Sequence, residues 1–161
     1  MTAGRALPLL AALMLGACGD EPATMPRVVV QTDLPGLQKI IRLPEGAIST
    51  RFALVATGAA NPRVPGPTDY QLFAFVRVFG LDGEGASMVL GKPLPERSVT
   101  VPEDVARALL REDAQAGLRF EHGEARIEGD CYDPARFAKP PYRASFAVFV
   151  DGGLLLGFHT T

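Results

Sequence analysis

Residues 70–79 constrain the fold more than any other part of the chain, because this segment is apolar on two alternating sides. As a β-strand it would direct Phe73, Phe75 and Phe79 to one face and a second apolar set to the other, namely Tyr70, Leu72, Ala74, Val76 and Val78. A strand that is apolar on both faces is buried on both. We therefore expect a central strand, covered by a second sheet or by the chain's one helix.

The rest of the chain after the first 26 residues predicts short strands separated by turns. Asp151, Gly152 and Gly153 mark the clearest hairpin, since Asp-Gly and Gly-Gly pairs adopt the tight turns that join antiparallel strands. The predicted fold is mainly β, a sandwich or strongly curved antiparallel sheet, with α+β as the alternative. The other expected strands are residues 28–31, 39–43, 51–57, 87–90, 118–122, 125–131, 144–150 and 154–159.

One short helix is predicted near residues 101–115. Thr100 and Glu103 have the spacing of a capping box, in which each side chain bonds to the other residue's backbone N–H. Pro102 is tolerated in a first helical turn, where its missing N–H has no intrahelical partner. Gly117 is a typical stop.

The N-terminus has the pattern of a secretory signal. Arg5 precedes an apolar run over residues 6–15, which ends in Leu15-Gly16-Ala17-Cys18. This segment resembles a bacterial lipoprotein signal, and the resemblance implies cleavage before Cys18 and lipidation of that cysteine. An apolar run of ten residues is shorter than the ~20 that a membrane-spanning helix needs. The alternative is an ordinary cleaved signal in which Cys18 has no special role.

The predicted organisation is a signal peptide over residues 1–17, the lipidated Cys18 with a tether to residue 26, and one globular β-rich domain over residues 27–161. Gly19 follows the cysteine where Asp would favour retention in the inner membrane. We therefore expect the outer membrane, with the domain facing the periplasm. Asp20, one position later, keeps the inner membrane as the alternative.

The charge balance argues against a nucleic-acid partner. The chain carries 16 basic and 18 acidic residues, with a formal net charge of −2 and no basic stripe. The expected partners are the membrane, through the N-terminal lipid, and a protein of the cell envelope.

Cys131 is a second cysteine, and a lipidated Cys18 cannot form a disulfide with it. Either Cys131 is a redox or intermolecular disulfide site, or it is a small buried apolar residue. Alternation favours burial, because Cys131 shares a face with Ala125 and Ile127 while charged residues occupy the other face.

The sequence contains no catalytic motif that we recognise. There is no Gly-x-Ser-x-Gly elbow of a serine hydrolase. Neither His122 nor His159 belongs to a recognised spacing of His and Cys metal ligands. We therefore predict no catalytic residue, no metal and no cofactor.

Three aromatic residues of one loop region, Tyr132, Phe137 and Tyr142, are a candidate patch for a protein partner. The alternative is that they fasten a long loop to the sheet.

Residues 41–47 and 132–137, together with Tyr142, Ala144 and the hairpin over 151–155, resemble segments of the small lipoproteins related to type III secretion pilotins. The resemblance implies a β-sandwich at the outer membrane and, for pilotins, a role in bringing a secretin ring to that membrane. It implies no catalytic residue.

Three functions remain open from the sequence. The first is a non-enzymatic envelope lipoprotein that binds or helps to assemble a protein partner, which predicts an apolar groove or a free strand edge. The second is a module for a small molecule or glycan, which predicts a closed apolar pocket. The third is a small periplasmic enzyme or inhibitor; an enzyme predicts a cleft with ionisable residues of perturbed pKa.

Overall fold

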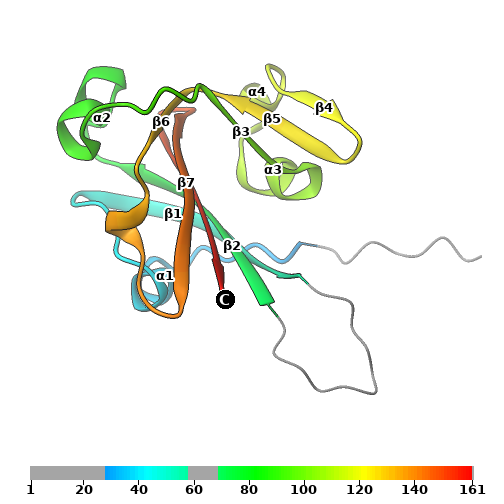
Figure 1. Ribbon diagram of the computed structural model, residues 1–161, viewed down its shortest axis with the longest axis horizontal. Coiled ribbons are helices and arrows are strands. Elements are labelled where there is room, and N and C mark those ends of the chain that lie inside the picture. The colour runs from blue at the N-terminus through cyan, green and yellow to red at the C-terminus, as the bar shows by residue number, and fades with distance from the viewer. Residues whose placement is uncertain (1–27, 58–68, 161) are drawn as a thin grey trace, which may run out of the picture.

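The computed structural model describes residues 28–57 and 69–160, and this part of the chain is mainly β, as predicted (Figure 1). The signal peptide, Cys18 and the tether lie outside the described residues. The elements are α1 (Leu34–Ile40), β1 (Ala47–Thr57), β2 (Asp69–Val78), α2 (Gly83–Leu90), β3 (Ser98–Pro102), α3 (Glu103–Leu109), α4 (Glu112–Gln115), β4 (Arg119–Glu121), β5 (Glu124–Glu128), β6 (Asp130–Tyr132), the 3-10 turn η1 (Ala135–Phe137), β7 (Tyr142–Val150) and β8 (Gly153–Thr160).

Five strands form one antiparallel sheet in the order β1-β2-β8-β7-β6. The prediction for residues 70–79 is confirmed for the strand itself, because β2 pairs on both sides and is buried on both faces from Leu72 to Val76. Phe79 lies just beyond the strand and is 80% exposed, so its predicted burial is wrong. Gln31 exchanges two backbone hydrogen bonds with Phe52 and covers the middle of the β1 edge.

Two apolar cores lie on opposite faces of this large sheet. On one face Leu72, Ala74 and Val76 pack with residues of α1, α2 and η1. On the other face Phe73 and Phe75 pack with α3 and with a small second sheet. The covering of β2 is therefore helical on one face, and a sheet together with a helix on the other.

The small sheet has the order β3-β5-β4 and is antiparallel. Figure 1 shows it at the upper right, set across the strands of the large sheet. The predicted strand 125–131 divides at Gly129 into β5 and β6, so one stretch of chain serves both sheets. A side chain at Gly129 would overlap the Phe149 carbonyl of β7, which explains why glycine stands at this crossing.

The hairpin at the C-terminal end of the domain is confirmed. β7 and β8 pair from Tyr142 with Thr160 to Val150 with Gly153. Asp151 and Gly152 have φ values of 51° and 67°, as a two-residue type I′ turn requires at both central positions.

The predicted single helix over 101–115 is wrong in its extent. Residues 98–102 form β3, and the helical part is divided into α3 and α4. Val99 and Val101 alternate toward the core opposite Ile127 and Ala125, and this strand pairing prevails over the helical pattern. The capping box does not form, because α3 begins after Pro102 without a side-chain cap.

The strands that the sequence predicted at 39–43 and 87–90 do not form: α1 ends at Ile40 with residues 41–43 in irregular structure, and α2 occupies residues 87–90. α1 buries Leu37, and Ile41 just past its end is also buried one helical turn later. α2 buries Ala86 and Leu90 in the same way, and Asp82 Oδ1 caps it by accepting from the Gly85 N–H at 2.6 Å. Among residues 28–57 and 69–160, no helix is long and apolar enough to cross a membrane.

Candidate functional site

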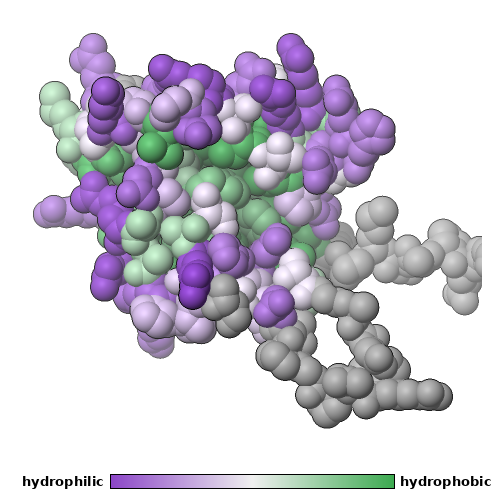
Figure 2. All heavy atoms as spheres, in the orientation of Figure 1, coloured by the Kyte–Doolittle hydropathy of each residue, from purple (hydrophilic) through white to green (hydrophobic). Residues whose placement is uncertain are grey.

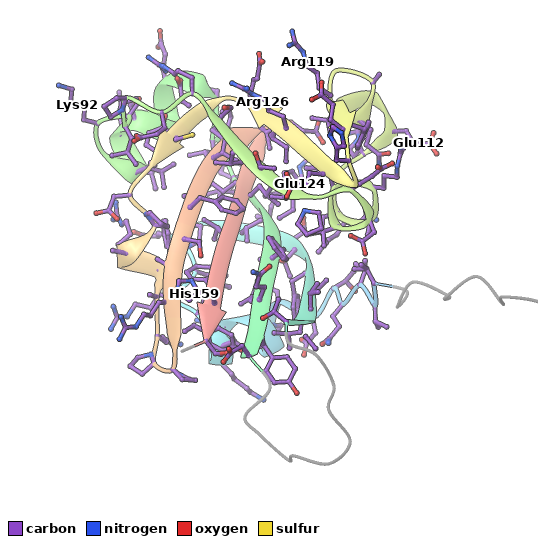
Figure 3. The ribbon with its side chains drawn as sticks, turned by 45° about the vertical axis from the view of Figure 1, so that its right-hand side comes forward. Lys92, Glu112, Arg119, Glu124, Arg126 and His159 are labelled. Atoms are coloured by element: carbon purple, nitrogen blue, oxygen red, sulfur yellow. The ribbon has the colours of Figure 1, made fainter. Side chains whose placement is uncertain are left out.

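A cleft of about 290 Å³ separates β3 of the small sheet from the face of the large sheet. In Figure 3, Glu124 on β5 marks the side of the small sheet, and His159 lies on β8 of the large sheet. The large sheet contributes Gln71, Phe73, Ser145, Phe146, Gly157 and Phe158, and the small sheet contributes Thr100, Val101, Pro102 and Glu124.

The floor of the cleft is aromatic. Phe73 of β2 and Phe146 of β7 lie with ring centroids 6.4 Å apart, tilted by 40°. A side chain at Gly157 of β8 would overlap the Phe146 ring, so the missing Cβ is what lets this ring lie over β8. The space-filling view shows apolar surface gathered across the middle of this face, below a polar upper rim (Figure 2).

One wall of the cleft is the outer edge of β3. The Gly129 N–H donates to the Arg97 carbonyl, and the Glu103 N–H donates to the Gly123 carbonyl. Hydrogen-bonded pairs alternate along an antiparallel ladder, so Val99 and Val101 bond to β5 while Ser98 and Thr100 direct their N–H and C=O groups away from it. No other described strand pairs with that edge. β3 therefore leaves free the N–H and C=O of Ser98 and Thr100 and the C=O of Pro102, and Thr100 and Pro102 line the cleft.

The rim opposite β3 carries a hydroxyl and an imidazole. The β7–β8 register shifts between Ala144 and Phe146, which leaves Ser145 unpaired and exposed. Its Oγ lies 2.9 Å from Nδ1 of His159. Among the described residues no carboxylate hydrogen-bonds to the imidazole of His159, so the third group that orients the base in a Ser-His-acid triad is not in place there.

The outer face of the small sheet is charged. Arg119 of β4 lies directly opposite Arg126 of β5, and Glu121 lies opposite Glu124. All four side chains are exposed (Figure 3 labels Arg119, Arg126 and Glu124). They line a hollow of about 230 Å³ together with Thr100. The three ion pairs found in the described part of the chain involve none of these four residues.

A third hollow, of about 480 Å³, lies where β1 begins and β2 ends. Ile48 at its side is 60% exposed and Phe79 is 80% exposed, with Arg77 and Asp82 beside them. This hollow has no signal in the sequence, because the register shift beside Ile48 arises from the pairing of β1 with β2.

The predicted aromatic patch is wrong as an exposed surface. Tyr132 is 1% exposed and Phe137 is 3% exposed, and both belong to the core beneath α1 and α2. Tyr142 is half-buried against the same core. Burial, and then the nearby Tyr70, raise the pKa of Tyr142. The three aromatics fasten the loop after β6 to the sheet, which was the alternative interpretation.

Cys131 is buried among Ala125, Ile127 and Val148, and the predicted alternation is confirmed. Burial raises the pKa of its thiol, and the carboxylates of Glu96 and Asp130 raise it further, while Arg97 lowers it. These causes together favour the neutral thiol over the nucleophilic thiolate.

Within the described residues, no three His, Cys, Asp or Glu side chains converge as a metal site would require. His122 lies in the turn between β4 and β5 with φ of 54°, away from His159 on β8.

Comparisons with protein-family models, with curated proteins and with solved structures found no match to this chain.

Proposed function

We propose that this protein is a lipid-anchored envelope lipoprotein that binds an extended segment of a partner protein in the cleft, without catalysing a reaction. The single observation that carries the proposal is the free edge of β3 above an apolar floor. A segment that adds to such an edge gains main-chain hydrogen bonds, while its alternate side chains enter the pocket below. The cleft supplies both halves of this arrangement.

The cleft suits a chain segment better than a small molecule. Its volume of about 290 Å³ is just below the ~300–1,000 Å³ that ligand pockets occupy. Thr100 and Ser145 on its two sides are exposed, so the cleft is open to solvent between them. A long polymer can lie across an open groove with its ends outside, whereas a small ligand needs a site that surrounds it.

The proposed anchor is the lipid on Cys18, and the proposed location is the outer membrane, with the domain facing the periplasm. Residues 19–26 of the tether span at most ~28 Å when fully extended, so the cleft would stay close to the membrane surface. A partner would then be another protein of the envelope. The resemblance to pilotin-related lipoproteins is consistent with a role in assembling such a partner.

Site-specific photocrosslinking in the native envelope tests the binding mode. We expect a photoreactive residue at Ser145, on the cleft rim, to give a discrete protein adduct, and the same residue at the exposed Glu112 of α4 to give none. Thr100→Pro should abolish the adduct because it removes an N–H from the free edge, and Thr100→Val should retain it. An adduct that survives Thr100→Pro, or no adduct at Ser145, would contradict strand addition.

Fractionation tests the anchor separately. Cys18→Ala should move the protein from the detergent-extracted membrane fraction to the soluble periplasmic fraction, because it removes the acylated thiol. Intact-mass measurement of the native protein should show a chain that begins at Cys18 and carries acyl groups. A chain that begins at Met1, or an unmodified Cys18, would refute the anchor and leave the cleft proposal untouched.

A further inference from the structure

We infer that the partner segment carries a basic-apolar-acidic-apolar-basic pattern over five consecutive residues. Its three charged residues would pair with charged rows, the sets of side chains that lie side by side across β3, β5 and β4 on the outer face of the small sheet. This inference rests on the proposed strand addition and names the chemistry of its partner. The apolar residues would point to the cleft floor, and the three charged residues would point to the opposite face.

The charged rows follow from the strand register. Opposite residues on neighbouring antiparallel strands lie side by side on the same face, so each row runs across the sheet. The middle row is basic and its two neighbours are acidic. From one end of β3 to the other, the rows are Ser98 with Glu128, then Thr100 with Arg126 and Arg119, then Pro102 with Glu124 and Glu121.

The side chains on β3 are short in all three rows. Ser98, Thr100 and Pro102 all lie on the outer face, and each is flanked on β5 by a long charged side chain. A strand added to β3 would lie two strand spacings, about 9.6 Å, from β5. Arg126 can extend over Thr100 toward such a strand, and the two glutamates of β5 can extend over Ser98 and Pro102. Side chains of the added strand that lie opposite Ser98, Thr100 and Pro102 would therefore interact with the charged residues of β5 in the same row.

The charges in these rows have no partner of opposite sign in their own row. Arg126 has Arg119 opposite it, and Glu124 has Glu121 opposite it. Like charges opposite one another destabilise a sheet, and opposite charges stabilise it. An acidic residue of the partner opposite Thr100, with a basic residue two positions away on each side, would place a charge of opposite sign in each of the three rows. The pattern reads the same in both chain directions, so it does not depend on how the segment enters.

Synthetic peptides test this reading on the full-length chain in detergent. The matched peptide has lysine, valine, aspartate, valine and lysine at its centre, and the reversed peptide exchanges lysine with aspartate. We expect the matched peptide to bind about tenfold or more tightly than the reversed one by fluorescence anisotropy, from three cross-strand rows that change sign. The difference should shrink in concentrated salt, because the rows are exposed.

Two protein variants serve as the matched pair. Arg126→Glu makes the middle row acidic at its centre and should remove or invert the preference for the matched peptide. Glu112→Arg changes the charge of an exposed residue on α4, outside the rows, and should leave the preference unchanged. Both side chains are exposed, so neither change removes a buried contact.

The possible results separate this inference from the proposed function. Equal binding of the two peptides, with a Ser145 adduct that Thr100→Pro abolishes, would overturn the charged rows and leave strand addition in place. No binding of either peptide, together with no adduct, would overturn both. A preference that Arg126→Glu leaves unchanged would also overturn the rows, because the selectivity would then arise elsewhere.

Discussion

Gly157 and Phe146 set the shape of the cleft floor. The ring of Phe146 occupies the space that a Cβ on Gly157 would fill, and it contacts Phe73 from the neighbouring side. Phe146 is half-buried, so it has cleft surface on one side and core on the other. The position of the Phe146 ring in the floor therefore requires that residue 157 has no Cβ.

Gly157→Ala should lower the free energy of unfolding by about 1–3 kcal/mol, because the added methyl must displace the Phe146 ring. Urea denaturation measures the change. Gly117→Ala is the matched control: the nearest atom to its added Cβ is the Ala114 carbonyl oxygen at 3.8 Å, so stability should be unchanged or slightly higher. Equal stability of Gly157→Ala and wild type would show that the ring does not lie over β8.

Cys131 makes stability depend on alkaline pH. Its pKa is raised above the ordinary 9.0 by burial first, so the folded protein keeps the proton at a pH where the unfolded chain releases it. The unfolded state then binds fewer protons, and stability falls as pH rises through and above 9.0. Cys131→Ala should flatten this fall. Urea denaturation from about pH 8 to about pH 10 measures the slope, and equal slopes for variant and wild type would contradict the assignment.

Strongly patterned strands were predictable from the sequence, and short helices were not. β2 is apolar on both faces and β7–β8 carries an Asp-Gly turn, so local patterns define them. α2 contains Gly83 and Gly85 and has little intrinsic helix preference; it depends on the Asp82 cap and on the burial of Leu90. The Asp82 cap is a local contact, three residues from Gly85, but the burial of Leu90 is tertiary, and a local pattern does not contain it.

The sequence predicted that a groove or a free strand edge exists, but not which residues form it. The sequence led to an apolar groove or a free edge, but Phe73, Thr100, Phe146 and Gly157 come from four separate strands. β3 was also read as the start of a helix, because Thr100 and Glu103 match a capping box. Alternation of Val99 and Val101 was the signal that could have identified the strand.

Two proline variants test the hydrogen-bonding direction of β3. Val101→Pro removes an N–H that faces β5, leaves the buried Ala125 carbonyl without its partner and replaces a buried side chain. It should cost at least about 2 kcal/mol more than Thr100→Pro, whose lost N–H faces the cleft. Chemical denaturation of both variants checks this. A Thr100→Pro variant as unstable as Val101→Pro would show that the β3 edge is already paired.

The whole domain is a large sheet against which a smaller one packs; the chain enters the smaller sheet after α2 and leaves it at Gly129. β8 lies in the middle of the large sheet and is buried along most of its length, while β4 has three residues at the edge of the small sheet. Stability should therefore differ between the two sheets, since buried central strands open least often.

Native-state hydrogen exchange should reveal this difference. We expect the amides of Leu155 and Leu156 in β8 to exchange slowest, and that of Arg119 in β4, whose N–H faces Arg126 of β5, to exchange at least about tenfold faster, through local opening of the small sheet. Mass spectrometry of peptic fragments measures both. Equal protection in β4 and β8 would mean that the two sheets open only together.

An unpaired strand edge can act as a template on which further strands add, as in amyloid. Here the edge of β3 overlooks a hollow of only about 290 Å³, whose far rim is Ser145. The first bound strand would cover the aromatic floor. A second strand could pair with the backbone of the first, but its side chains would have no apolar surface to pack against. If a partner binds as proposed, such an edge would saturate at one bound chain, and sheet growth would end there.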